Sequence, residues 1–328
     1  MLDVAIFDFV NLDFSIIRQL VAKTLPAQLQ EIDPKGLLWV ACDFDPRNLA
    51  ESGPYVIAEA ISQQMGWHLL NIVIRPDFAR TDIAFAFTDV CEYFLLFVRD
   101  AVHHFNKDLV REKHIWQKAE WGKREKNYFP LGKDPGNVWL PTLDDGNGTV
   151  VGHAPMTLEE TLARCILLAV PRQTEVVPER KTLEARIFTR RPTSGQKVVA
   201  ILEQSAREKQ VTYANARTSL PRDEARNALV SALNAENALP LGEYACLLQF
   251  DGTTFTCRRA STGDVVGSLR TTSPLSALWA AANDGTDPEI RISKAFNLAT
   301  ATNQAAKVQA IIEGAWFPRD WNIQVEAI

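Results

Sequence analysis

VAIFDFV, residues 4–10, is an apolar run that a single acid, Asp8, interrupts. Such a run is typical of a strand buried on both faces of a parallel sheet. Segments with helical or strand character follow it in alternation: FSIIRQLVAKTL (14–25, ending near Pro26), GLLWVACDF (36–44), PYVIAEAISQQMG (54–66), WHLLNIVIRP (67–76) and EYFLLFVRD (92–100). This alternation predicts an α/β protein built on a βαβ-type sheet.

The rest of the chain predicts an inserted region and a second domain. Periodicity fades over residues 101–150, and the helix that follows carries Thr157 and Glu160 at capping-box spacing. We therefore expect a first domain over 1–175 with a recognition insertion at 101–150, a linker over 176–194, and a helical α+β domain over 195–328. In the last of these, helical segments precede the strands EYACLLQF (243–250) and TTFTCRR (253–259), which predicts a winged helix.

Composition narrows the class of protein. The chain has 328 residues, of which 46% are hydrophobic and 23% charged, as in ordinary globular proteins. Because no apolar run is long enough to span a membrane and no signal peptide is visible, we expect a cytoplasmic protein without membrane contact. The five cysteines are scattered, and the histidines lack partners at ligand spacing, so we expect reduced thiols and no metal site.

A basic segment stands out against the net charge of −5. Its cations are candidates for contact with DNA phosphates, and so are polar residues of the helix expected over 220–236. Trp116, Trp121, Tyr128 and Trp139 could stack on bases or anchor their loop. The candidates for DNA binding are Lys107, Arg111, Lys113, Lys118, Lys123, Arg124, Lys126, Lys133, Trp139, Arg222, Arg226 and Asn227. A solvated charged surface is the alternative for each cation.

The order of these segments resembles the amino-directed DNA methyltransferases, which modify N4 of cytosine or N6 of adenine, in the group whose catalytic half comes first. The matching pieces are FDFVNLDF (7–14), GLLWVACDF (36–44), EAISQQMGWHLLNIVIRP (59–76), FTDVCEYFLLFVRD (87–100), GKDPGNVWL (132–140) and HAPMTLEETLARCILLA (153–169). The resemblance implies an incomplete Rossmann-like sheet and places His153, Glu160 and Arg164 at positions that line the cofactor pocket. It also implies that Asp89 and Glu92 brace the loop after Asp8.

Two departures from the family pattern predict a loss of catalysis. Where the family has Asp-Pro-Pro-Tyr or a relative, this chain has Asp8, Phe9, Val10 and Asn11, so the rigid prolines and the fourth-position aromatic are absent. The Gly-rich loop that grips S-adenosylmethionine is expected after the helix at 153–169, yet AVPRQTEVVPERKTLEARIF (169–188) has no glycine before Gly195. We therefore expect no cofactor unless a partner completes the site, and a cofactor-binding half that is missing.

Three functions remain open at this point. In the first, the chain is a degenerate methyltransferase-like protein that binds double-stranded DNA as a subunit of a modification or defence complex, as a homodimer or with an active methyltransferase or defence protein. In the second, it is one subunit of a split methyltransferase whose partner supplies the S-adenosylmethionine site. In the third, it is a scaffold for protein assembly or an unrelated enzyme.

Overall fold

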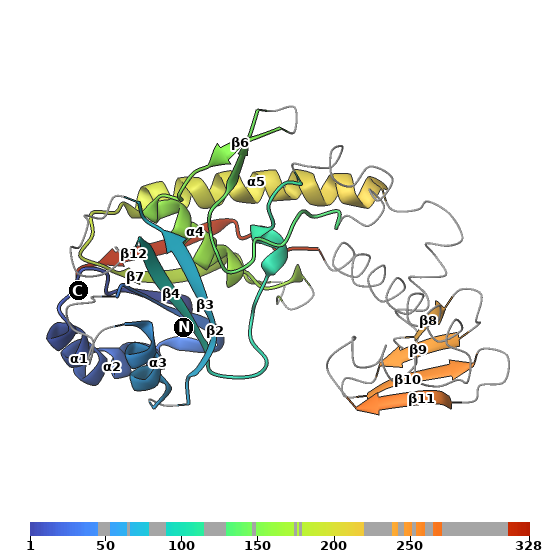
Figure 1. The fold of residues 1–328 in the computed structure, drawn as a ribbon, viewed down its shortest axis with the longest axis horizontal. Coiled ribbons are helices and arrows are strands. Elements are labelled where there is room, and N and C mark those ends of the chain that lie inside the picture. Colours follow the sequence, from blue (N-terminus) through green and yellow to red (C-terminus); the bar gives the residue numbers. More distant parts are fainter. Residues whose placement is uncertain are drawn as a thin grey trace. The chain divides into compact units, whose positions relative to one another are not determined.

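The computed structural model describes most of the first 219 residues, four strands of the following region and the last 15 residues (Figure 1). The described ranges are 1–44, 53–63, 66–78, 90–114, 129–145, 149–173, 176, 179–219, 238–241, 246–250, 254–259, 265–270 and 314–328. The chain divides into two compact units, one formed by residues 1–211 with 314–328 and the other by residues 212–313.

The first unit is built on a six-stranded sheet with the strand order β12-β7-β1-β2-β4-β3. Its strands are β1 (Leu2–Asp8), β2 (Ile32–Cys42), β3 (His68–Pro76), β4 (Cys91–Val98), β7 (Thr182–Phe188) and β12 (Asp320–Glu326). Strands β12, β7, β1 and β2 are parallel, and β4 is antiparallel to both of its neighbours, β2 and β3. The sheet is thus mostly parallel, and the sequence did not indicate the reversed strand.

Helices cover both faces of this sheet, as Figure 1 shows. Helices α1 (Phe14–Lys23), α2 (Leu25–Gln30) and α3 (Pro54–Ser62) lie on one side, and α4 (Leu158–Leu168) and α5 (Gly195–Ser219) lie on the other. Side chains alternate between the faces of a strand. Ala5, Phe7 and Phe9 accordingly belong to the core cluster that α1–α3 cover, so Val4, Ile6 and Asp8 point toward the α4 side.

The helix termini follow from local signals in the sequence. Asp13 caps α1 by accepting a hydrogen bond from the Ser15 amide. The expected helix over 14–25 is two helices, because Pro26 lacks the amide hydrogen that a continuous helix needs but fits the first turn of a new one. The capping box of α4 is confirmed, with both reciprocal bonds between Thr157 and Glu160.

The observed division into units differs from the expected one. Strand β7 lies inside the segment expected to be a linker, and it pairs with β1 along Val4–Phe7. Helix α5 follows it, and β12 then pairs with the other edge of β7 along its whole length. Residues 182–219 after α4 thus form a strand, a loop and a helix, where a linker was expected over 176–194. The strand β12 belongs to the first unit.

The described part of the second unit consists of the end of α5, residues 212–219, and a four-stranded antiparallel sheet with the order β11-β10-β9-β8. Its strands are β8 (Ala238–Leu241), β9 (Cys246–Phe250), β10 (Thr254–Arg259) and β11 (Val265–Arg270). The expected hairpin is confirmed as β9 and β10. The winged helix stays a prediction, because the helix expected over 220–236, with Arg222, Arg226 and Asn227, lies outside the described residues.

Three small elements lie within or at the end of the region expected to be an insertion, residues 101–150. They are a 3₁₀ turn, η1 (Lys107–Val110), and a hairpin formed by β5 (Thr142–Asp144) and β6 (Val150–His153).

In the described part of the chain, no helix is both long and apolar enough to cross a lipid bilayer.

Candidate functional site

Buried charged side chains gather at one edge of the large sheet. The parallel strands β1, β3 and β7 end at this edge, and the antiparallel strand β4 begins there. Asp8 is the last residue of β1, Arg75 lies near the end of β3, and Glu92 lies near the start of β4. The carboxyl ends of parallel strands are the usual location of binding sites in open α/β sheets.

Asp8 is bound by an arginine from the loop after β7. Arg191 Nε lies 2.6 Å from Asp8 Oδ2, and Nη2 lies 2.8 Å from Oδ1, a bidentate arrangement. The Thr189 hydroxyl donates to Oδ2 at 2.7 Å, and the Val10 amide donates to Oδ1 at 3.3 Å. Only 2% of Asp8 is exposed. The Asp8 carboxylate is therefore saturated by hydrogen-bond donors of its own chain.

The same arginine bridges to a second acid. Arg191 Nη1 lies 2.5 Å from Glu92 Oε1, and Arg75 Nη1 lies 2.8 Å from Glu92 Oε2. Arg75 and Glu92 stand directly opposite each other on β3 and β4, and Arg75 Nε donates to the Met156 carbonyl just before α4. Asp8, Arg191, Glu92 and Arg75 thus form one continuous row, which we call the charge ladder.

Electrostatics in the charge ladder favour the ionised arginine. Burial by itself lowers the pKa of Arg191, because a dry environment penalises the charged guanidinium. The negative charges of Asp8 and Glu92 and their hydrogen bonds outweigh this effect, and the pKa of Arg191 is raised above its ordinary value. Arg191 is therefore a fixed positive charge in this site, and its proton does not take part in chemistry near neutral pH.

The residues after Asp8 do not offer a stacking surface. Phe9 and Val10 are buried at 1% and 3% exposure, and Phe9 packs in the core with Phe7. Asn11 has a positive φ of 62°, a conformation that asparagine tolerates better than most residues, and its amide donates to Asp43. Phe9 therefore cannot replace the missing aromatic in this arrangement. Asp89 lies outside the described residues.

The loop at 131–140 is anchored to the sheet and to the segment that follows η1. The Ile74 amide donates to the Asn137 carbonyl, the Trp139 amide donates to the Ile74 carbonyl, and Glu112 and Lys133 exchange backbone bonds. Trp139 is 2% exposed, lies 5.9 Å from the ring of Trp39 and is covered by the guanidinium of Arg164. Of its two predicted roles, anchor and DNA contact, the structure places Trp139 as an anchor.

Three described cations of the basic segment, Lys107, Arg111 and Lys113, pair with acids of the chain. Lys107 lies 2.6 Å from Asp134, Arg111 lies 2.5 Å from Asp108, and the exposed Lys113 lies 3.5 Å from Asp144. Although partial burial raises the pKa of Asp134, the hydrogen bond and charge of Lys107 lower it overall. The Lys133 side chain is exposed. Outside the described residues lie Trp116, Lys118, Trp121, Lys123, Arg124, Lys126 and Tyr128.

The three positions expected to line a cofactor pocket are not brought together by side-chain contacts among the described residues. His153 is exposed on β6, and Glu160 completes the capping box of α4. Arg164 donates through both terminal nitrogens to Glu112 at 3.2 Å. Burial lowers the pKa of Arg164, with Glu112 acting against this effect. Glu160 and Arg164 thus have structural roles here.

The described residues contain no cluster of His, Cys, Asp and Glu that could hold a metal ion.

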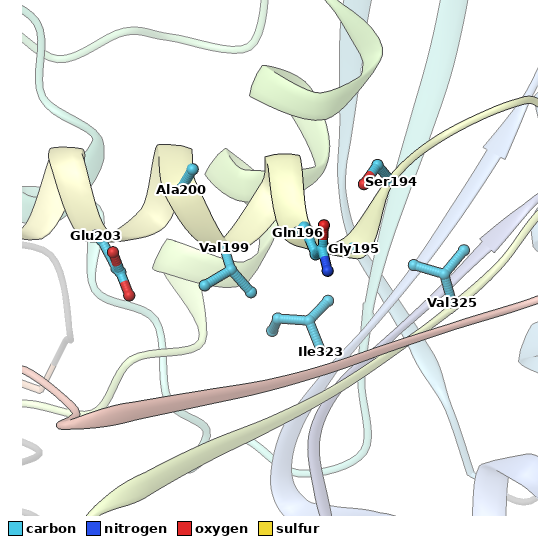
Figure 2. Close-up of a pocket in the computed structure, with 8 residues that line it drawn as sticks. All are labelled: Ser194, Gly195, Gln196, Val199, Ala200, Glu203, Ile323 and Val325. Atoms are coloured by element: carbon cyan, nitrogen blue, oxygen red, sulfur yellow. The ribbon is translucent and has the colours of Figure 1, made fainter.

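A pocket of about 480 Å³ lies between α5 and β12 (Figure 2). Val199 from the helix and Ile323 and Val325 from the strand form its apolar lining, and Gln196 and Glu203 lie at its helical side. Ser194 and Gly195, at the start of α5, complete one end. None of the residues that line this pocket belongs to the charge ladder.

Arg191, Thr189 and Arg75 were not singled out as site residues. The sequence carries a signal for the first two, since TLEARIF (182–188) alternates apolar and polar residues like a strand and FTRRPTSG then precedes a helix. The charged residues around this stretch led to its interpretation as a linker. Arg75 had no such signal, because its partner Glu92 is 17 residues away and only strand pairing brings the two together.

No protein-family model matches the chain, and no curated protein matches its sequence. Two crystal structures of M1.HpyAVI are similar to it in part. The structure of its SAM complex has 13% sequence identity and a TM-score of 0.32, over 64% of this chain and 78% of that one. The other M1.HpyAVI structure has 12% identity and a TM-score of 0.30, over 63% and 76% of the respective chains.

Proposed function

We propose that this chain is a catalytically silent, methyltransferase-like protein that binds DNA as a subunit of a modification or defence complex. The observation that carries the proposal is the occupation of Asp8 by Arg191, with contacts of 2.6 and 2.8 Å in a site where Asp8 is almost fully buried. A base whose amino group is to be methylated must itself reach the acid at this position. An arginine of the protein stands in its place.

The binding half of the proposal rests on the basic segment. Lys133 presents an exposed side chain on an anchored loop, and several further cations lie in the adjacent residues 115–128. A rigid loop loses little conformational entropy when it meets a ligand, which favours binding. Lysine and arginine side chains on such a loop contact DNA phosphates, which carry no sequence information. The proposal therefore predicts that this segment contributes DNA affinity without a strong sequence preference.

DNA binding is tested by measuring affinity for duplex DNA by fluorescence anisotropy across a salt series. The logarithm of the affinity should fall with the logarithm of the salt concentration, and each lost phosphate contact should reduce the slope by about 1. We expect this reduction for Lys133→Ala and larger losses for Lys118→Glu with Lys123→Glu. Lys197→Glu, at an exposed position on α5, is the matched control and should bind like the wild type. Absent binding at low salt would refute the DNA-binding role.

Catalytic silence is tested separately with labelled S-adenosylmethionine and mixed-sequence DNA. We expect no methyl incorporation by the chain alone. Incorporation that Asp8→Ala abolishes would instead show an active methyltransferase and overturn this half of the proposal. The split-enzyme alternative predicts incorporation only when a partner protein is added, and calorimetry with S-adenosylmethionine on the purified complex distinguishes it.

A further inference from the structure

We propose that Asp8 and Glu92 form a preformed receptor for a planar guanidinium group and that Arg191 is its built-in ligand, which closes the receptor in the free chain. The inference goes beyond the proposed function, and its tests need neither DNA nor a methyl donor. It makes the loop at 189–194 an autoinhibitory contact over a binding site and not merely a connection between β7 and α5.

The geometry is specific for a guanidinium. All three nitrogens of Arg191 are used: Nε and Nη2 donate to the two oxygens of Asp8, and Nη1 donates to Glu92. A ligand that makes these three contacts needs three N–H donor groups in one plane at fixed angles. The guanidinium group has this geometry. An ammonium group is a compact charge with no such fork, so it cannot bridge both carboxylates in the same way.

The receptor is positioned by groups other than Arg191. Thr189 and the Val10 amide hold Asp8, and Arg75 holds the second oxygen of Glu92 from the facing strand. The carboxylates lie on sheet strands, where packing fixes their backbone. Removal of the Arg191 side chain should therefore leave both acceptors close to their present positions, with an uncompensated negative charge between them.

Arg191 is more accessible than the acids it contacts. Its side chain is 19% exposed, whereas those of Asp8 and Glu92 are 1% and 2% exposed. The neighbouring Arg190 and Pro192 are exposed, and the described backbone bonds of the loop include those from Thr189 to Glu326 and from Arg191 to the Thr189 hydroxyl. The guanidinium thus enters the receptor from the solvent side, along a path that a free guanidinium could also take.

Chemical rescue tests the inference. Arg191→Ala should lower the midpoint of thermal unfolding, and methylguanidinium at about 10–50 mM, far below the molar denaturing range, should restore much of the loss. Methylammonium at the same concentration should restore less. The double variant Asp8→Asn with Arg191→Ala should lose the rescue, because its receptor is incomplete. Arg190→Ala is the matched control and should show no specific stabilisation, like the wild type, whose receptor is full.

Three results would overturn the inference: equal stabilisation by both cations, equal stabilisation of the double variant, or equal stabilisation of the wild type. If Arg191→Ala does not fold, Arg191→Lys keeps the positive charge and carries the test. Its lysine cannot complete the fork, so methylguanidinium should still raise its unfolding midpoint. A failure of methylguanidinium to do so would count against the receptor, whatever the outcome of the DNA-binding and methyl-transfer assays.

Discussion

At the scale of single residues, the charge ladder is a specific arrangement whose net contribution to stability is small. Burying ions costs several kcal/mol each, and their mutual attraction offsets this only when every partner is present. Asp8, Glu92 and Arg75 are each less than 10% exposed, so the loss of one charge leaves its partner in a dry environment. The ladder is therefore far more sensitive to the removal of one member than surface pairs are.

Replacing Arg75 tests this sensitivity. Arg75→Met should lower the free energy of unfolding by about 3–5 kcal/mol, because Glu92 loses a partner and the Met156 carbonyl loses its donor. Lys113→Met, whose exposed side chain pairs with Asp144 at 3.5 Å, is the control and should change the free energy by about 0–1 kcal/mol. Urea unfolding followed by tryptophan fluorescence measures both, and similar losses in the two variants would contradict the argument.

The partly buried Lys209 should make the free energy of unfolding depend on pH. Burial lowers its pKa to about 8, and the positive charges of Arg164 and Arg111 act in the same direction. The unfolded lysine has a pKa of about 10.4. Between these values the unfolded chain binds more protons than the folded chain, so the folded state gains stability as the pH rises and is penalised below pH 8.

The lysine should therefore add about 1–2 kcal/mol to the free energy of unfolding between about pH 7.5 and 9.5. This gain should be absent from Lys209→Met, so the difference between wild type and variant isolates it from other titrating groups. Denaturant unfolding across this pH range provides the measurement. A difference that stays constant with pH, or that falls as pH rises, would show that Lys209 is not the group responsible.

At the scale of elements, the conformation of the loop at 131–140 depends more on Gly132 than on Gly136. Gly132 has a φ of 113°, and an added Cβ would clash with the Glu112 carbonyl oxygen in the backbone bridge. Gly136 also has a positive φ, of 69°, but an added Cβ would meet open space. Backbone conformation penalises alanine at both positions, whereas the close approach of another backbone exists at Gly132 alone.

Gly132→Ala should consequently lower the free energy of unfolding by more than Gly136→Ala, which should cost about 1–2 kcal/mol. Hydrogen exchange at Lys133 and Glu112, whose amides form the bridge, should rise in the Gly132 variant and remain near the wild-type rate in the other. Equal exchange in the two variants would mean that the bridge does not anchor the loop.

Some elements of the fold could be predicted from the sequence, and others could not. Strands β1, β2, β3 and β4 and the helices α3 and α4 follow from apolar runs, helical spacing and capping residues, because local chemistry specifies them. Strand β7 was missed since its alternating pattern lies between charged residues, and Arg191 was missed with it. The contacts of Arg191 with Asp8 and Glu92 span 183 and 99 residues, so only the pairing of β7 with β1 creates them.

At the scale of the molecule, the large sheet is assembled from both ends of the chain. Residues 314–328 bring β12 to the outer edge of β7, and the buried Trp316 lies over Arg180. Arg190 also donates to the Ile328 carbonyl. Strand β7 therefore has partners on both edges only when the last strand is in place.

Deleting residues 320–328 should expose β7 as an edge and speed hydrogen exchange in Leu183–Ile187, because these residues lose the pairing with β12. A deletion of residues 327–328 keeps β12, removes the bond from Arg190, and is the matched control. Mass spectrometry of exchanging peptides distinguishes the two. Unchanged exchange in β7 after the longer deletion would contradict the parallel pairing.

The position of β12 also imposes an order on folding during synthesis. After β7 and most of α5, the chain forms the second unit of 102 residues, 212–313, and only then supplies the strand that covers β7. A ribosome adding about 5–20 residues per second leaves β7 without that neighbour for several seconds. During this interval the free edge of β7 can pair with another nascent chain, and a chaperone that covers this edge would lower the risk.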